Sequence, residues 1–478
     1  MKIPFLGGAY EGRSSNVAPE TCVNLFYEKG INGEALVGTP GSTVLTAGSS
    51  TEVAPVRGGI AYNNKAYFVI GNSFYEIDPV TGSATNHGDL NTSSGRVSMA
   101  HNGVRSGANQ QIMVVDGANG WIFNNATSGW AVIPDGDFTS AKTVCFIDGY
   151  FIYNENNEDG KFWLTDLYDG NAITPTNFAN AEGWPDKILS VLADNRQLFL
   201  FGEESLEVWY NSGDVDNVFQ RYQGGFKQHG CAAAFTPQRF DNSVIWLSRN
   251  DRGDSQVVRL GEGYMPRIVS TPEIDYQIST YGDVSDAFGY VYQDEGHEFY
   301  VLTFPTANKT WAYDASTQQW HQRAHNINSV FPSRERYNCH VFVGGKHLLG
   351  DFENGNIYQL DNTIGTFNGN VVERERTTIP ISNEEDRTRI VSLQLDMEEG
   401  IGDGATSNDD VFWLSYSKDG GHTFSNETSR AAGDGGQWKT RVIWRRLGWA
   451  RNWIFRIRTW TTARPVLKGL IAKVYGSG

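Results

Sequence analysis

The sequence has few cysteines and no long apolar segment. Its four cysteines, at positions 22, 145, 231 and 339 of 478 residues, never form a Cys-x-x-Cys pair. This spacing argues against a zinc site and against the disulfide framework of a small secreted domain. No run approaches the roughly 18 apolar residues of a transmembrane helix, and residues 1–8 lack the apolar core of a signal peptide. We therefore expect buried free thiols, no membrane span and synthesis in a cytoplasm.

Motifs for catalysis and for metal binding are also missing. The Gly-Lys pairs at residues 160–161 and 345–346 lack both the upstream glycine and the downstream hydroxyl residue of a phosphate-binding loop. His297-Glu298 lacks the second histidine of the zinc-protease motif. We expect a protein without enzymatic activity, without a bound metal and without a cofactor.

A hairpin pattern repeats from about residue 58 to residue 361. Each unit has a short run of β-branched and aromatic residues, a turn with Gly, Asn or Asp, and a second run that often closes on Asp. Helical periodicity is nearly absent, and residues 186–194 are the one short candidate for a helical turn. The first runs are residues 66–70, 112–115, 150–153, 198–201, 244–247, 299–302 and 347–349, and their partners are residues 74–78, 121–123, 162–164, 206–209, 257–260, 311–314 and 357–361.

The spacing of these hairpins predicts an all-β protein built around a β-propeller. Seven units, roughly 40–55 residues apart, match the length of a propeller blade, which buries its faces against its neighbours. We predict six or seven blades over residues 58–369, and an extended arm or a ring-closing strand over residues 1–57. The alternative is a set of unrelated hairpins in a β-sandwich.

The pattern changes after residue 361. Residues 389–396 alternate between apolar and polar side chains, as a half-buried strand does. We predict a separate, C-terminal β-sandwich-like interface domain over residues 370–478. Its further strands are expected at residues 411–417 and 453–460, and its flexible stretches at residues 398–410 and 428–437.

Residues 417–424 (SKDGGHTF) resemble the Asp-box of sialidase-like propellers. In that motif the Asp and the glycines fix a hairpin turn, and the motif usually recurs in several blades. Here it appears once, so we interpret it as a structural turn. A propeller-type glycosidase is the alternative, and it would need paired carboxylates a few ångströms apart, which the 55 acidic residues do not identify by sequence.

The charge is strongly polarised along the chain. The 39 basic and 55 acidic residues give a net charge of −16, which disfavours non-specific binding of the whole molecule to nucleic acid or anionic membranes. Residues 438–478 hold ten basic and no acidic residues, which leaves −26 for residues 1–437. Within residues 441–460, cations alternate with large apolar side chains. The candidate interface residues are Arg441, Arg445, Arg446, Arg451, Arg456, Arg458, Trp444, Trp449 and Trp453.

A strand of this kind packs one face and presents Arg and Trp on the other. These residue types are enriched at protein interfaces, and arginine also binds phosphates. Because the rest of the chain is acidic, we predict contact with an acidic protein surface. A solvated strand face and a nucleic-acid contact are the alternatives.

Several segments resemble one family. They are residues 7–14 (GGAYEGRS), 22–28 (CVNLFYE), 38–41 (GTPG), 95–101 (GRVSMAH), 162–167 (FWLTDL), 439–448 (KTRVIWRRLG) and 465–467 (PVL). Together, and in this order, they are similar to the packaged DNA stabilisation, or tail-hub (nozzle), proteins of short-tailed bacteriophages. The Gly-rich segment near residues 400–410 departs from the family pattern.

The resemblance implies a structural virion protein of the tail, present in the host cytoplasm during assembly. In that family a homo-hexameric ring lies below the portal and its adaptor ring and extends the DNA channel. It retains the packaged double-stranded DNA without sequence-specific binding, and attaches a tail needle, tip, or fibre and spike proteins. The family has no catalytic motif, so the resemblance implies no catalytic residue. A glycosidase and a carbohydrate- or receptor-binding tail protein are the alternative functions.

Overall fold

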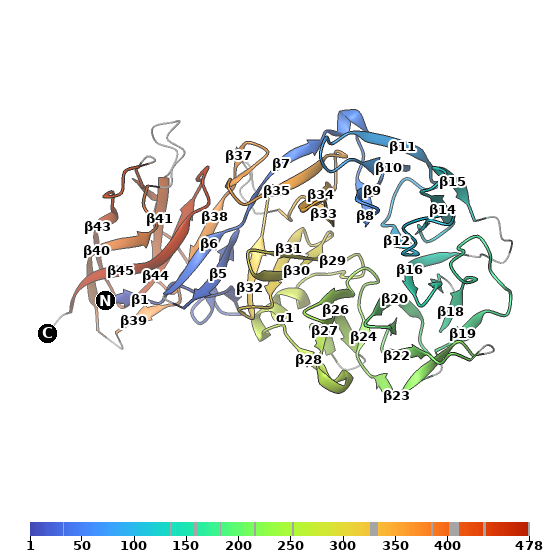
Figure 1. Ribbon diagram of the computed structural model, residues 1–478. Helices are drawn as coiled ribbons and strands as arrows, with labels where there is room; N and C mark the ends of the chain where they lie inside the picture. Colours follow the sequence, from blue (N-terminus) through green and yellow to red (C-terminus); the bar gives the residue numbers. More distant parts are fainter. Residues whose placement is uncertain are drawn as a thin grey trace.

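The structure is a computed structural model. It describes residues 1–31, 33–133, 136, 138, 140–156, 160–181, 183–214, 217–250, 253–325, 333–383, 386–400, 411–433 and 436–476. Figure 1 shows an elongated molecule with a β-propeller at one end and a β-sandwich at the other. The predicted fold class is confirmed.

The strands of the described residues form seven propeller blades around a central axis (Figure 1). From the inner to the outer strand, they are β8 (Val56–Tyr62), β9 (Lys65–Ile70), β10 (Ser73–Ile77) and β11 (Ala84–Asp89); β12 (Ser98–His101), β13 (Gln111–Val115), β14 (Gly120–Asn124) and β15 (Gly129–Val132); β16 (Ala141–Ile147), β17 (Tyr150–Glu155), β18 (Lys161–Leu164) and β19 (Phe178–Asn180); β20 (Ile188–Asp194), β21 (Gln197–Gly202), β22 (Leu206–Asn211) and β23 (Phe219–Lys227); β24 (Gly230–Cys231) and β25 (Gln238–Phe240) with β26 (Ser243–Asn250), β27 (Gly253–Leu260) and β28 (Pro266–Ile268); β29 (Phe288–Asp294), β30 (His297–Phe304), β31 (Lys309–Asp314) and β32 (Gln319–Arg323); and β33 (Tyr337–Val343), β34 (Lys346–Asp351), β35 (Ile357–Asp361) and β7 (Gly41–Thr46).

The predicted hairpins are the second and third strands of all seven blades. Residues 66–70 and 74–78 pair as β9 and β10, and the last predicted pair forms β34 and β35. The second strand of each blade is buried on both faces, which explains its continuous apolar run. The prediction of a helical turn at residues 186–194 is wrong, because residues 188–194 form the inner strand β20.

The last blade is completed by a strand from the other end of the chain. β7 pairs antiparallel with β35, with Gly41 opposite Asp361. The hydrogen bonds of this ladder join the beginning of the propeller to its end. The ring is therefore held closed by strand pairing as well as by packing between blades.

The sandwich contains two sheets. The first sandwich sheet has the order β43 (Val442–Ala450), β40 (Thr388–Met397), β45 (Val466–Gly476), β6 (Gly33–Gly38) and β5 (Leu25–Gly30), with β1 (Lys2–Ile3) beside β45. The second sandwich sheet has the order β4 (Cys22–Val23), β38 (Arg374–Thr377), β44 (Asn452–Thr459), β41 (Val411–Ser417) and β42 (Thr428–Ala431), with β39 (Ile381–Ser382) beside β44. The strand predicted at residues 411–417 is confirmed as β41.

The remaining elements are short. They are the hairpins β2 (Tyr10–Glu11) with β3 (Pro19–Glu20) and β36 (Thr366–Phe367) with β37 (Asn370–Val371), the 3-10 turns η1 (Gly48–Ser50) and η2 (Glu262–Tyr264), and the helix α1 (Pro272–Ser279). Thr271 caps α1 by accepting a hydrogen bond from the Ile274 N–H. No helix in the described part of the chain is long and apolar enough to cross a membrane.

Two predicted flexible stretches have different outcomes. Residues 428–431 form β42, and the register of β42 with β41 is fixed by four residue pairs. Residues 401–410, which include most of the Gly-rich segment, lie outside the described residues.

The prediction of buried free thiols is confirmed, because all four cysteines are buried and unpaired.

Candidate protein interface

The predicted basic block forms two consecutive strands that belong to different sheets. β43 pairs with β40 in the first sandwich sheet, and β44 pairs with β41 and β38 in the second. The turn at Arg451 therefore crosses from one sheet to the other. As a consequence, the basic side chains of β43 and β44 face two different sides of the sandwich.

The two tryptophans at positions 444 and 453 lie in the core between the sheets. Each is 1% exposed. The Trp444 indole N–H donates to the Thr428 carbonyl at 2.7 Å, and the Trp453 N–H donates to the Thr388 carbonyl at 3.3 Å. Burial keeps both side chains from touching a partner directly, so they can only support the strands that carry the arginines.

Four of the predicted arginines and one tryptophan are exposed. They are Arg441, Arg445, Arg446, Arg451 and Trp449. The register between β40 and β43 shifts between Ile390 and Ser392, and Arg446 has a φ of 64°. This bulge interrupts the alternation of the strand, so two successive arginines point outwards.

Arg456 and Arg458 lie on the second sandwich sheet and have acidic partners within the chain. An Arg458 nitrogen lies 3.3 Å from Glu375 and another lies 2.9 Å from Glu427, and Arg458 also forms a close ion pair with Glu373. Hydrogen bonding to Glu427 and the charges of the neighbouring carboxylates outweigh burial and raise the pKa of Arg458. Unlike the arginines of β43, these two are neutralised locally.

The sequence analysis missed the role of residues 373–376, which read Glu-Arg-Glu-Arg. In β38 the alternation sends Glu375 towards Arg458 and the two arginines into the core. The Arg376 guanidinium donates to the carbonyls of Phe5 and Gly8, both at 2.7 Å, and Arg374 donates to the Gly365 carbonyl at 2.9 Å. The period-two alternation of charge was the signal that could have identified this strand.

A cavity of about 340 Å³ lies where the propeller meets the sandwich. Its walls include Glu11, Lys309, Glu375, Arg456 and Arg458. Burial raises the pKa of Glu11 to about 7, although the nearby Lys309 partly opposes this shift. Among the described residues, no group of three or more His, Cys, Asp or Glu side chains could hold a metal ion.

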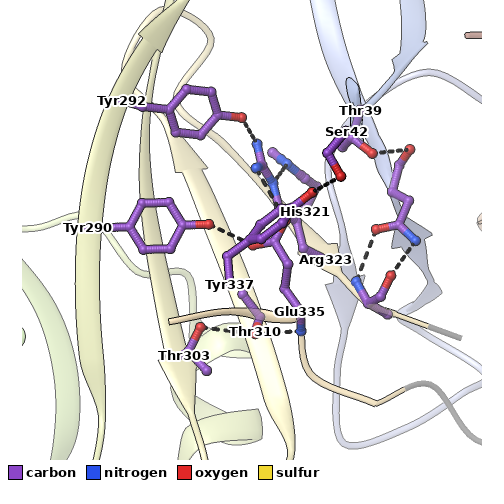
Figure 2. A network of polar contacts seen from close by, with 12 residues as sticks. Thr39, Ser42, Tyr290, Tyr292, Thr303, Thr310, His321, Arg323, Glu335 and Tyr337 are labelled. Carbon is purple, nitrogen blue, oxygen red and sulfur yellow. Dashed lines mark hydrogen bonds and ion pairs between the residues drawn. The ribbon is translucent and has the colours of Figure 1, made fainter. Parts of the chain in front are cut away.

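A buried polar network closes the seam between the last two blades and β7 (Figure 2). Arg323 of β32 lies 3.6 Å from Glu335 and donates a short hydrogen bond to the Tyr292 hydroxyl. The Tyr290 hydroxyl donates to Glu335 at 2.8 Å, and Tyr337 bonds to Ser42 of β7 at 2.7 Å. Because these groups come from four segments, the network fixes the position of β7 in the ring.

Asn24 connects the propeller to the sandwich. Its side-chain amide donates to the carbonyls of Ala324 and Glu373, both at 2.8 Å, and its oxygen accepts from the Ala324 N–H at 2.9 Å. Asn24 has a φ of 53°, a left-handed conformation that asparagine tolerates better than most residues. Three hydrogen bonds from one side chain thus tie β4 to both domains.

The Asp-box segment is a tight turn in the structure. The Asp419 carboxylate accepts from the Thr423 N–H at 2.9 Å, and the Ser417 hydroxyl accepts from the Gly421 N–H at 2.8 Å. Hydrogen bonds from the Thr423 hydroxyl, the Thr423 N–H and the Ser417 hydroxyl hold the Asp419 pKa well below its usual range. The Asp419 carboxylate is engaged in hydrogen bonds within its own turn, as expected if the segment is a structural turn.

Two family models together match almost the whole chain. A family model described as the β-propeller of bacteriophage P22 Gp10 matches residues 1–365, and one described as the β-sandwich of the same protein matches residues 373–475. The chain belongs to the Gp10 family. It is therefore a structural protein of the phage tail hub, with the two domains of that family. No curated protein matches it.

Solved structures resemble the Gp10-family chain only distantly. The computationally designed protein Ika8 is 11% identical, with a TM-score of 0.37, over 66% of this chain and 99% of that one. The N-terminal domain of Nup159 is 9% identical, with a TM-score of 0.43, over 75% of this chain and 99% of that one. A chain of the mitotic checkpoint complex is 11% identical, with a TM-score of 0.43, over 67% of this chain and 93% of that one.

Proposed function

We propose that this tail-hub protein forms a hexameric ring below the portal adaptor, extends the DNA channel and retains the packaged genome. The ring would also attach the tail needle or tip. The observation that carries the proposal is the row of exposed arginines on the sandwich, of which Arg445 and Arg446 are successive, on a chain that is otherwise acidic. Such a surface suits assembly with other proteins, and an acidic channel wall would let DNA slide past without sticking.

The test uses particles assembled in the absence of this chain. We expect them to fill with DNA and then lose it, and purified protein added before the loss should restore nuclease-protected DNA. The measurement is the amount of protected DNA per particle over time. Particles that lack the chain yet keep their genome as long as complete particles would contradict retention as its function.

We also propose that the protein has no glycosidase activity. A retaining or inverting glycosidase needs two carboxyl groups that are free to act on the sugar. In the cavity between the domains, Glu373 and Glu375 are both bound by Arg458. Release of reducing sugar from host polysaccharide by the pure protein, abolished by Glu11→Gln, would overturn this proposal.

A further inference from the structure

The exposed face of the first sandwich sheet carries cations in register across its strands. Arg389 of β40 is paired with Trp449 of β43 and with Tyr475 of β45. In the next row, Ser392 is paired with Arg445 on one side and with Lys473 on the other. We call the exposed side chains of these strands and of β1 the cationic face.

Large apolar side chains lie among these cations. Trp449 is 45% exposed, Tyr475 is 56% exposed and Ile471 is 43% exposed. The Arg389 guanidinium lies 6.0 Å from the centre of the Trp449 ring. A solvated strand face has little reason to expose three such side chains together, whereas aromatic residues and arginine are the usual anchors of protein interfaces.

The cationic face has almost no negative charge of its own. In β1, β40, β43 and β45 the single acidic residue is Asp396, and it lies 3.8 Å from Lys468. Within the described part of the chain, no ion pair involves Arg389, Arg445 or Lys473. Three cations are therefore available for a partner.

The protein's own propeller has the complementary charge. Residues 56–365 contain 20 basic and 36 acidic side chains. The cationic face cannot reach this propeller in the same molecule, because β43, β40 and β45 lie at the end of the sandwich farthest from the blades (Figure 1). We propose that the cationic face docks on the acidic propeller of a second copy of this chain.

A contact of this kind joins two different surfaces of identical molecules. Such head-to-tail interfaces generate closed rings or open filaments, whereas a contact between two identical patches would stop at a dimer. The inference deepens and rests on the proposed ring, and it names the surface that would build it.

The test reverses three charges in the full chain. Arg389→Glu, Arg445→Glu and Lys473→Glu together should weaken self-association by about tenfold or more in sedimentation velocity at about 0.05 M salt. The wild-type chain should also dissociate as the salt is raised to about 0.5 M. A matched control is the triple variant Arg13→Glu, Lys29→Glu and Arg430→Glu, which makes the same charge change at exposed residues outside both the cationic face and the propeller blades and should associate normally.

Three results would overturn the inference. The first is a charge-reversed face variant that assembles like the wild type. The second is a wild-type chain that stays monomeric at low salt and high concentration. The third is loss of binding to labelled double-stranded DNA in the face variant with unchanged self-association, which would assign the face to nucleic acid. None of these results would affect the DNA-retention test, so failure of this contact is distinguishable from failure of the proposed function.

Discussion

At the scale of single residues, Arg323 is a charge buried in the propeller. Its side chain is 3% exposed and contacts Glu335 and Tyr292. Because Arg323→Met leaves Glu335 largely buried without a cation, we expect the free energy of unfolding to fall by about 3 kcal/mol in urea titrations. The double variant with Glu335→Gln should recover part of this loss, and the exposed change Arg196→Ala should cost less than about 0.5 kcal/mol. Equal effects of the two arginine changes would contradict the importance of the network.

Glu11 predicts a pH dependence of stability. Its folded pKa of about 7 exceeds the ordinary value of 4.5, so the folded state binds the proton more tightly than the unfolded state. The stability from this group is present below about pH 4.5 and is lost as the pH rises through about 7. Glu11→Gln should therefore be more stable than the wild type at pH 8, by about 1–3 kcal/mol, with little difference at pH 4.5. Thermal denaturation across this range measures the difference, and the exposed Glu28→Gln is the control; a constant offset at all pH values would contradict the prediction.

At the scale of elements, the packing of neighbouring blades depends on a glycine in an outer strand. A Cβ on Gly88 of β11 would lie 2.1 Å from Cδ1 of Trp130 in β15. Trp130 also stacks on Phe74 with 4.6 Å between ring centres. We expect Gly88→Ala to lower the free energy of unfolding by about 1–3 kcal/mol, because the indole must move. Gly282→Ala, where an added Cβ meets no atom within 4 Å, is the control and should have a much smaller effect.

Strand β43 and the turn that follows it allow a test of the exposed arginines. Changing Arg445, Arg446 and Arg451 to Ala should leave the propeller folded, since all three side chains are exposed. Each interfacial anchor typically contributes about 1–3 kcal/mol to binding, so we expect filled particles that lose their DNA. Protected DNA and infectivity are the measurements. Stable infectious particles would show a merely solvated strand face, and slower ejection with normal assembly would indicate contact with DNA.

The strands that the sequence analysis predicted are mainly the buried ones. β9 and β10 lie inside their blade and have long apolar runs, so the sequence predicted them. The outer strands β11 and β15 contain no buried residue; polar side chains hid β11, and β15 has only four residues. A ring-closing strand within residues 1–57 was one of the two predicted alternatives, but no local pattern identified residues 41–46 as the partner of residues 357–361. The sequence also could not show which residues of the basic block are exposed and which are buried. The bulge at Arg446 breaks the alternation of inward and outward side chains on which such a prediction depends.

At the scale of the whole molecule, the proposed ring predicts a defined mass. One chain has a mass of 53.1 kDa, and we expect a particle of about six times this mass, alone or on the adaptor ring. Light scattering and class averages of negatively stained particles measure mass and symmetry. A stable monomer that also fails to bind any connector ring would contradict the hexamer.

The strand ladder between β7 and β35 has a consequence for biosynthesis. Gly41 leaves the ribosome long before Asp361, its partner in the ladder. Lys2 likewise leaves the ribosome long before Ile471, its partner in the first sandwich sheet. The ring cannot be completed before residue 361 has been translated, and the first sandwich sheet cannot be completed before residue 471. Until then the early strands expose unpaired edges, which are prone to non-native pairing. A nascent chain interrupted before residue 357 therefore lacks both closures.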